Sequence, residues 1–322
     1  MTWRSRRVVA VAGVALAAGL AACGSNGATD SGESEASGGQ SYTISHHKGK
    51  TELPAEPQRV VALDPSLVEA VAAIDQDRLA GGIGTYDEEQ SFPSYLGDSV
   101  AGVEWVGPLD SPNLEAITAL KPDLIVSASI RHEDVYDELS KIAPTVFVET
   151  TGPTWKDNIT KVAEAMGAED TAETKLEEYE QRAASLGKAI NEKAGDPEIS
   201  VVRFMDGPTR LVGHDSFTGI ILKDMGLARP TAQDIDEFAL EVGEEQIRKA
   251  DGDYIFVSAY EGGEPSQEQF QRNPLWRKLD GVKAGNVHEV NDATWMMSVS
   301  LQGAHFMLDD MAEIFDVDPM RS

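Results

Sequence analysis

The stretch from 155 to 193 constrains the fold most, because it is predicted to form a long helical segment in the middle of the chain, interrupted at Gly167. After the interruption, apolar residues recur at spacings of three and four, as on one face of a helix: Leu176, Tyr179, Ala183, Leu186 and Ile190. From 171 to 193 there is no Pro and only one Gly, Gly187. This predicts a rod roughly 30 to 35 Å long. Strand and helix patterns alternate on both sides of it, so the sequence predicts two α/β lobes joined by a stiff helix, the layout of a binding protein.

The first 22 residues have the pattern of a secretory signal peptide. Arg4, Arg6 and Arg7 precede an apolar run, 8–20, that is too short to span a bilayer. The run ends in Leu-Ala-Ala-Cys, and Cys23 is the only cysteine of the chain. This arrangement resembles the bacterial lipobox, which implies cleavage before Cys23 and acylation of its sulfur. The alternative is an ordinary signal peptide whose cysteine is incidental.

Residues 23–41 are rich in Gly, Ser and acidic residues and predict a solvated tether with a reach of roughly 20 to 25 Å. Removal of residues 1–22 leaves 24 basic and 55 acidic residues, a formal charge of −31. Such a surface repels nucleic acid and anionic lipid head groups. We therefore expect no nucleic-acid partner and attachment to the membrane through the lipid anchor alone.

Three segments follow the tether: an N-terminal α/β lobe (42–153), the connecting helix (154–194) and a C-terminal α/β lobe (195–322). In the N-terminal lobe the patterns predict a hairpin at 42–53, strands at 59–63, 79–83, 123–127 and 145–149, and helices at 64–72, 111–120 and 133–142. In the C-terminal lobe they predict strands at 198–204, 209–212, 253–257 and 286–290, and helices at 217–225, 244–250, 274–279 and 299–315. Strands that alternate with helices in this way imply parallel sheets with right-handed crossovers.

Two segments, one from each lobe, align without gaps: 115–127 and 245–257. Each runs from a Glu through a short helix to an Asp and then a buried strand, so the two lobes are predicted to be structural copies. Glu115 and Glu245 would then occupy equivalent places. The residues alone leave two interpretations open. Each Glu could simply stabilise a helix N-terminus, or the two could form a two-point docking surface for a partner that is itself two-fold.

Ligands of open parallel sheets bind beyond the carboxyl ends of the strands. The candidates that follow strands are Arg131, Arg203, Tyr260, Trp295 and Met297, and Tyr86 lies in a long loop, 84–102, that is a candidate wall of the pocket. Aromatic and Met side chains would form an apolar wall, and Arg would offer a forked donor for anionic oxygens. The alternatives are that Trp295 closes the core of its lobe and that the arginines are surface charges.

The chain contains no recognisable catalytic or metal-binding motif. The segment 213–219 (GHDSFTG) differs from the G-x-S-x-G elbow, and H-E-x-x-H, C-x-x-C and phosphate-binding loops are missing from the sequence. We expect no enzyme and no metal held by protein ligands. A lipid-anchored hydrolase that uses Ser216 and His214 is a remote alternative.

Six segments and one further residue resemble a known family. The segments are 59–63 (RVVAL), 106–115 (VGPLDSPNLE), 121–126 (KPDLIV), 142–145 (IAPT), 242–246 (VGEEQ) and 273–276 (NPLW), and the residue is Trp295, which follows the last segment in the sequence. Over about 59–315 the chain resembles the substrate-binding lipoproteins of ABC importers for ferric siderophores and cobalamin, the class with two lobes joined by a rigid helix.

The resemblance implies a permease dimer, driven by a cytoplasmic ATPase, whose arginines meet Glu115 and Glu245. Catecholate-binding members carry Arg at the place of Arg131, at the place of Tyr260 and near Phe217. This chain keeps only the first, which favours a ferric hydroxamate of the desferrioxamine kind. In hydroxamate-binding members a Trp and a Tyr occupy the places of Trp295 and Met297, so Met297 is a departure.

The expected protein is a monomeric, lipid-anchored receptor on the outer face of the cell membrane, in a sequence similar to those of actinobacteria. Its ligand residues are predicted to be Arg131, Tyr260, Trp295, Met297, Arg203, Phe217 and Tyr86. The iron arrives already chelated, so neither a cofactor nor a protein ligand to iron is needed. A haem or cobalamin receptor of the same fold, with Met297, His214 or Tyr260 as axial ligand, is the nearest alternative.

Overall fold

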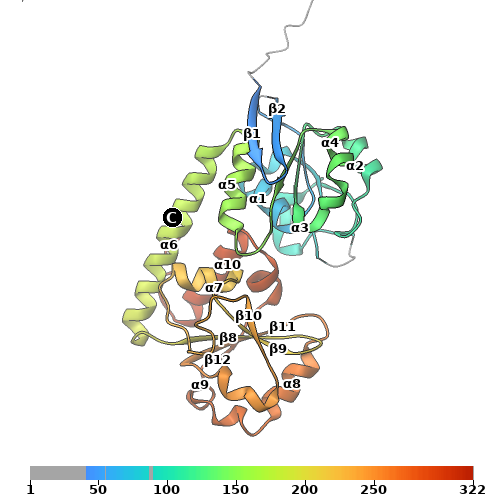
Figure 1. Cartoon of the computed structure of the whole chain (residues 1–322). Coiled ribbons are helices and arrows are strands. Elements are labelled where there is room, and N and C mark those ends of the chain that lie inside the picture. The colour runs from blue at the N-terminus through green and yellow to red at the C-terminus, as the bar shows by residue number, and fades with distance from the viewer. Residues whose placement is uncertain (1–40, 55, 87–89, 322) are drawn as a thin grey trace, which may run out of the picture. The chain divides into compact units, whose positions relative to one another are not determined.

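Two five-stranded β-sheets, connected by long helices, form the framework of the residues that the structure describes (Figure 1). The structure is a computed structural model that describes residues 41–54, 56–86 and 90–321. Both sheets belong to one compact unit, Gly39–Ser322. The predicted signal peptide, Cys23 and all of the tether but its last residue lie outside the described residues. No helix within the described ranges is long and apolar enough to cross a membrane.

The N-terminal lobe begins with the predicted hairpin, β1 (Tyr42–His46) and β2 (Gly49–Leu53), which pair antiparallel. Its sheet is parallel throughout, with the order β5-β4-β3-β6-β7. The strands are β3 (Val60–Ala62), β4 (Leu79–Gly82), β5 (Glu104–Trp105), β6 (Leu124–Ala128) and β7 (Thr145–Val148). The helices are α1 (Pro65–Asp75), η1 (Gln76–Arg78), η2 (Ser94–Val100), α2 (Leu114–Leu120), α3 (Ser129–His132), η3 (Glu133–Val135) and α4 (Tyr136–Ile142). β3, β6 and β7 are buried along their whole length, as their mostly apolar sequences indicate.

The sheet of the C-terminal lobe is mixed, with the order β10-β9-β8-β11-β12. The strands are β8 (Ile199–Phe204), β9 (Thr209–Val212), β10 (Ala239–Val242), β11 (Tyr254–Ala259) and β12 (Val287–Glu289). β8, β11 and β12 are parallel to one another. β9 pairs antiparallel with β8, because a short turn joins the two strands, and β10 pairs antiparallel with β9. The helices are α7 (Phe217–Asp224), η4 (Glu244–Ala250), α8 (Glu264–Arg272), η5 (Trp276–Lys278), α9 (Asp280–Ala284), η6 (Ala293–Met297) and α10 (Leu301–Ile314).

Two consecutive helices connect the lobes, α5 (Trp155–Met166) and α6 (Glu169–Ala194), with the predicted break at Gly167. α6 has 26 residues, which corresponds to about 39 Å. Within the predicted stripe of α6, the side chains of four residues are buried: Tyr179, Ala183, Leu186 and Ile190. A side chain at Gly187 would lie 1.7 Å from the carbonyl oxygen of Met225, so α6 packs directly on the backbone that follows α7. The α/β fold with two lobes and a long connecting helix is therefore confirmed, and the residue boundaries assigned to the lobes stay a prediction.

One apolar core extends through both lobes. The same buried cluster contains Val60 and Leu67 of the N-terminal lobe, Leu186 of α6, and Phe256 and Leu308 of the C-terminal lobe. Each lobe has a second, smaller cluster of its own. The lobes are therefore joined by a shared interior as well as by the connecting helices.

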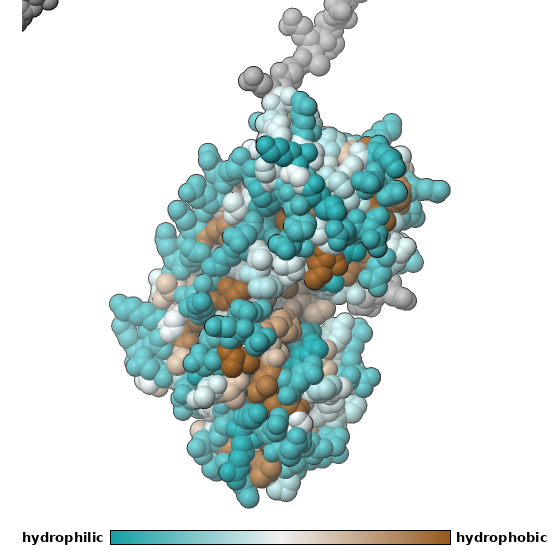
Figure 2. All heavy atoms as spheres, in the orientation of Figure 1, coloured by the Kyte–Doolittle hydropathy of each residue, from teal (hydrophilic) through white to brown (hydrophobic). Residues whose placement is uncertain are grey.

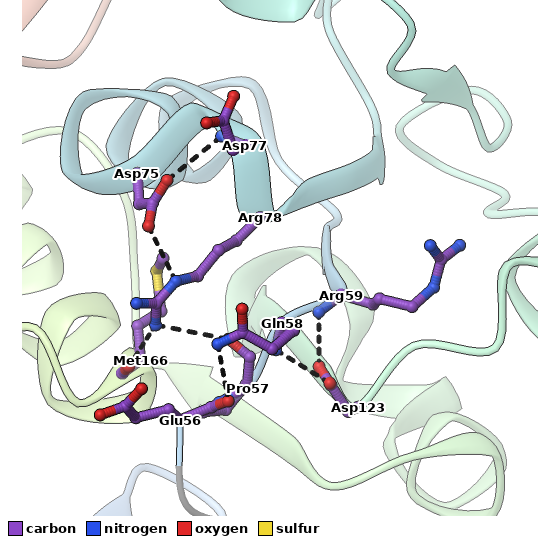
Figure 3. A network of polar contacts seen from close by, with 9 residues as sticks. All are labelled: Glu56, Pro57, Gln58, Arg59, Asp75, Asp77, Arg78, Asp123 and Met166. Atoms are coloured by element: carbon purple, nitrogen blue, oxygen red, sulfur yellow. Dashed lines mark hydrogen bonds and ion pairs between the residues drawn. The ribbon is translucent and has the colours of Figure 1, made fainter.

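The aligned segments are equivalent in three dimensions. The carboxylate of Asp123 accepts hydrogen bonds from the amides of Gln58 and Arg59, both at 2.8 Å, just before β3 (Figure 3). The carboxylate of Asp253 accepts a hydrogen bond of 2.8 Å from the amide of Glu198, just before β8. Each Asp thus attaches its strand, β6 or β11, to the start of the neighbouring strand. The copies differ in one respect, since α2 is an α-helix and η4 is a 3₁₀-helix.

The end of α5 is attached next to the segment that precedes β3 (Figure 3). The guanidinium of Arg78 donates a hydrogen bond of 2.9 Å to the carbonyl oxygen of Met166 and forms an ion pair of 2.8 Å with Asp75 (Figure 3). These contacts fix the point at which the chain leaves the N-terminal lobe and turns toward α6.

Candidate ligand-binding cleft

A cleft of about 540 Å³ lies between the two lobes, a size common for small-molecule sites. Every part of its wall follows a strand, as the sequence predicted: Pro65 follows β3, the loop from Gly84 follows β4, Tyr260 follows β11, and Asp292 comes shortly after β12. The residues that line it are Pro65, Gly84, Thr85, Tyr86, Ser91, Phe92, Pro93, Ser94 and Tyr95 from the N-terminal lobe, and Ala259, Tyr260, Glu261, Asp292, Ala293 and Met297 from the C-terminal lobe. On the face shown in Figure 2, hydrophobic residues are visible where the two lobes meet.

The N-terminal wall is backed by an Asp–Arg–Tyr group, Asp64, Arg131 and Tyr86. The Asp64 carboxylate caps α1 by accepting hydrogen bonds from the amide (2.9 Å) and the hydroxyl (2.5 Å) of Ser66. Its second oxygen pairs with Nε of Arg131 at 3.1 Å, and the Arg131 guanidinium lies 5.6 Å from the centroid of the Tyr86 ring. The positive charge of Arg131 is therefore partly satisfied inside the lobe.

The C-terminal wall has a second such group, Asp292, Arg203 and Tyr260. Arg203 binds the carboxylate of Asp292 through two hydrogen bonds, Nε to Oδ1 at 2.7 Å and Nη2 to Oδ2 at 2.6 Å. The hydroxyl of Ser258 also donates to Oδ1 of Asp292 at 2.9 Å. The Arg203 guanidinium lies 4.8 Å from the centroid of the Tyr260 ring and donates to Sδ of Met297 at 3.1 Å. Such bidentate, largely buried pairs are held strongly.

These two groups determine the electrostatic character of the cleft. Each arginine is engaged by a carboxylate of its own lobe. The lining itself includes the carboxylates of Glu261 and Asp292 and, among the described residues, contains neither Lys nor Arg. The cleft therefore offers aromatic surface and hydrogen-bonding groups without an excess of positive charge.

A buried carboxylate, Glu69, lies behind the cleft and was not predicted as a site residue. Glu69 is the fifth residue of α1, a helix of mostly apolar residues, and only 1% of it is exposed. Tyr95 donates a hydrogen bond of 2.8 Å to Oε1, Ser298 donates one of 2.5 Å to Oε2, and Ser300 also donates to Oε2. Removal from water raises the pKa of the Glu69 carboxyl to about 7, although the three hydroxyl groups lower it. The signal in the sequence was a lone acidic residue within Leu-Val-Glu-Ala-Val.

The structure places the predicted ligand residues in two groups. Tyr86, Tyr260 and Met297 line the cleft, and Arg131 and Arg203 contact the tyrosines of its walls. Whether any of them contacts a ligand stays a prediction.

Trp295 and Phe217 are not part of the cleft lining, and their role in ligand binding stays a prediction. Trp295 is fully buried, its indole N–H donates to Oδ2 of Asp310 at 2.7 Å, and its ring stacks on Phe256 with 5.1 Å between centroids. Phe217 packs edge-to-face against Trp155, with 5.5 Å between centroids. Both rings close the shared core, because apolar neighbours and a carboxylate partner are available there.

The residues of the hydrolase alternative have structural roles. The hydroxyl of Ser216 donates to the carbonyl oxygen of Gly213 at 2.8 Å and accepts from the amide of Gly219 at 2.9 Å, which makes it the N-cap of α7. His214 contacts Oδ1 of Asp234 at 2.7 Å. Within the described ranges there is no cluster of three or more His, Cys, Asp or Glu that could hold a metal ion.

Glu115 and Glu245 are exposed at equivalent positions near the starts of α2 and η4. Neither carboxylate forms an ion pair with any residue that the structure describes. Both are therefore available to a cationic partner, and their assignment to docking stays a prediction.

The fold and the cleft agree with the comparisons with known proteins. The chain matches the model of the periplasmic binding protein family over residues 60–294, and it belongs to that family. It is a binding protein and not an enzyme. A probable siderophore-binding lipoprotein of Bacillus subtilis, YfiY, is 34% identical over 309 residues, which cover 92% of this chain and 94% of the relative.

Two further relatives carry names that describe their ligands. The Fe(3+)-citrate-binding protein YfmC of Bacillus subtilis is 32% identical over 301 residues, which cover 90% of this chain and 91% of YfmC. The crystal structure of Staphylococcus aureus SirA complexed with staphyloferrin B matches with a TM-score of 0.75 at 29% identity, over 86% of this chain and 99% of SirA.

Proposed function

We propose that this protein is the lipid-anchored substrate-binding protein of an ABC importer, and that it captures a ferric hydroxamate siderophore at the outer face of the cell membrane. Family membership and the siderophore-binding relative support a role in the uptake of iron complexes. Cys23 would carry the lipid, and residues 23–41 would hold the monomeric receptor near its permease. Glu115 and Glu245 would each meet one subunit of the permease dimer.

The charge of the cleft is the observation that carries the choice of ligand. A ferric tris-hydroxamate is neutral or cationic overall, so it needs no unpaired arginine. A tris-catecholate complex is strongly anionic and would have to draw Arg131 and Arg203 away from their carboxylates. Breaking the Arg203–Asp292 pair, which is largely buried and held by two hydrogen bonds, would cost about 3 to 5 kcal/mol. The walls formed by Tyr86, Tyr260 and Met297 suit the apolar chains that link hydroxamate groups.

A ferric carboxylate complex of the citrate kind is the second candidate, and Arg131 is the observation that favours it. Its side chain is 29% exposed and is held to Asp64 by a single contact of 3.1 Å, so it could turn toward a ligand carboxylate. The name of YfmC points to a ligand of this kind. Arg203, held at two points and largely buried, is less available.

Titration by tryptophan fluorescence with ferrioxamine, ferric citrate and a ferric catecholate tests the proposal. Trp295 lies two residues from Met297, close enough for an iron complex in the cleft to quench it. We expect the tightest binding for ferrioxamine, and for a neutral ferrioxamine an affinity that changes little with salt, because such a ligand carries no net charge. Tighter binding of ferric citrate would shift the function to the second candidate, and tighter binding of the catecholate would overturn the charge argument. A shifted Soret band on addition of haem would instead support the haem alternative.

A further inference from the structure

The carboxylate of Glu69 connects the two walls of the cleft. Glu69 belongs to α1 of the N-terminal lobe, whereas Ser298 and Ser300, which donate to it, belong to the segment between η6 and α10 of the C-terminal lobe. Its third donor, Tyr95, lies on the loop that forms the N-terminal wall. One side chain therefore holds three hydroxyl groups from two lobes.

Each of these donors lies in or next to the cleft lining. Tyr95 lines the cleft itself, and Ser298 directly follows Met297, which lines it from the other side. The ring of Tyr95 also packs edge-to-face on Phe306 of α10, with 5.9 Å between centroids. Gln302 donates a hydrogen bond of 3.1 Å to the carbonyl oxygen of Glu69. A change at Glu69 would thus act on both walls at once.

The start of α10 holds the backbone of this segment at one point. A side chain at Gly303 would come within 1.9 Å of the carbonyl oxygen of Ser298, so the backbone of Ser298 lies directly on the first turn of the helix. This close approach fixes the backbone from which the Ser298 hydroxyl donates to Glu69. The Ser298 hydroxyl therefore reaches Glu69 from a backbone that is packed against α10.

We infer that Glu69 is a positioning residue for ligand capture, which holds Tyr95 and the segment 297–300 at the separation that the ligand requires, and which does so fully only when it is ionised. The part of the inference that concerns ligand capture rests on the proposed function, in which the ligand is an iron complex. Glu69 itself does not line the cleft, so it acts through Tyr95 and through the segment that carries Met297.

The chemistry of the carboxyl group explains why ionisation matters. An ionised carboxylate only accepts hydrogen bonds, so all three hydroxyl groups can donate to it. A protonated carboxyl must donate one hydrogen bond, so at least one of the three hydroxyls has to reorient. The charged and titratable groups that face Glu69 are Asp64 at the start of its own helix and Tyr86 and Tyr95 on the wall loop, while the C-terminal lobe presents Ser298, Ser300 and Gln302. No cation among the described residues pairs with it.

The ionisation of Glu69 falls in an accessible range of pH, since burial raises the pKa of its carboxyl to about 7. We expect the affinity for the iron complex to fall about five-fold as the pH is lowered from 8 to 6, the equivalent of one lost hydrogen bond. Glu69→Gln keeps the shape of the side chain and removes the titration. Its affinity is expected to stay constant over this range.

The test combines two measurements on the full chain. Hydrogen exchange of the ligand-free protein, corrected for the intrinsic effect of pH, is measured over 91–100 and 295–303, and ferrioxamine binding is titrated at pH 6 and 8. In the wild type we expect weaker binding at pH 6 and faster corrected exchange in both segments there, through local openings in which Glu69 stays buried. Global unfolding, which hydrates Glu69, should instead become rarer at pH 6. In Glu69→Gln neither should change with pH. Glu138→Gln, the same substitution at an exposed position without a hydrogen-bond partner in the described residues, should follow the wild type.

Each outcome decides between the alternatives. A wild-type pH profile in Glu69→Gln, in exchange or in binding, overturns the inference. If the wild type binds none of the iron complexes, the proposed function fails, while the exchange measurement on the ligand-free protein still tests Glu69. Should Glu69→Gln not fold, Tyr95→Phe keeps the ring and removes one donor. It is expected to move the midpoint of the exchange profile to higher pH, because the lost hydrogen bond had lowered the pKa of Glu69, and an unmoved midpoint contradicts the inference.

Discussion

Replacement of Glu69 by Gln should change the dependence of stability on pH by an amount that the structure defines. The carboxyl of Glu69 has its pKa raised from 4.5 to about 7 by burial in the folded protein. Because the folded value lies above the unfolded value, the stabilising contribution is fully present below about pH 4.5 and is lost as the pH rises through about 7. At high pH the buried, ionised Glu69 therefore destabilises the fold by up to about 3 kcal/mol, of which about 2 kcal/mol develops between pH 5.5 and 8.5.

Urea unfolding of the wild type and of Glu69→Gln at pH 5.5 and 8.5 measures this contribution. The other ionisable groups titrate in both proteins, so the difference between the two free energies of unfolding isolates Glu69. We expect Glu69→Gln to gain about 2 kcal/mol relative to the wild type when the pH is raised from 5.5 to 8.5. In Glu138→Gln, at an exposed position, the difference from the wild type should stay constant.

The reasoning would be refuted by a difference between Glu69→Gln and the wild type that is the same at both pH values. That result would mean that Glu69 stays ionised throughout, stabilised by its three hydroxyl donors beyond what burial costs. A change of the opposite sign cannot come from Glu69, whose carboxyl has a pKa of 4.5 in the unfolded chain, and would mean that the substitution alters the titration of another group.

Three further predictions concern the framework, the cleft and the docking surface. Gly187→Ala removes a poor helix former from α6, which by itself would stabilise the helix by about 1 kcal/mol. The added methyl group, however, would lie 1.7 Å from a carbonyl oxygen, so we expect a net loss of about 1 to 3 kcal/mol in the free energy of unfolding, measured with urea. A gain in stability would show that α6 and α7 separate easily. Arg131→Ala should weaken capture of the iron complex and should also lower stability by about 1 to 3 kcal/mol, because the buried carboxylate of Asp64 loses its charged partner. The double variant with Asp64→Asn, which keeps the helix cap, should recover the stability. Unchanged capture in the single variant would exclude Arg131 from the site. Glu115→Ala combined with Glu245→Ala should abolish uptake by cells and leave the fluorescence titration unchanged, because both side chains are exposed and lie outside the cleft lining; a loss of affinity in the titration would show that their assigned role is wrong.

Most of the framework could be predicted because apolar runs and helical periodicity are local signals. The buried strands of both sheets, the stripe of α6 and the break at Gly167 all follow from residues close together in the chain. β5, α8 and β10 were not predicted, because their apolar runs or helical periodicity are weak. β5 has only two residues, and α8 (EPSQEQFQR) is polar with a single buried residue, Phe270. β10 is the edge strand of its sheet, and its place depends on pairing with β9.

The position of the cleft could also be predicted, because it follows from the ends of parallel strands. The direction of individual side chains could not. Trp295 follows a strand end in the sequence, but its indole is directed into the core, where Asp310 accepts its hydrogen bond. The pairing of Arg203 with Asp292 joins residues 89 positions apart, and Glu69 meets Ser298 across 229 positions. Contacts over such separations are determined by the packing of whole elements and leave no local pattern.

The apolar interior that passes from α1 through α6 to α10 has a consequence for how the protein denatures. Halves that share one interior cannot be separated without exposing it to water, so neither half is expected to be stable when expressed alone. Calorimetry should accordingly record a single heat-absorption peak for the whole receptor.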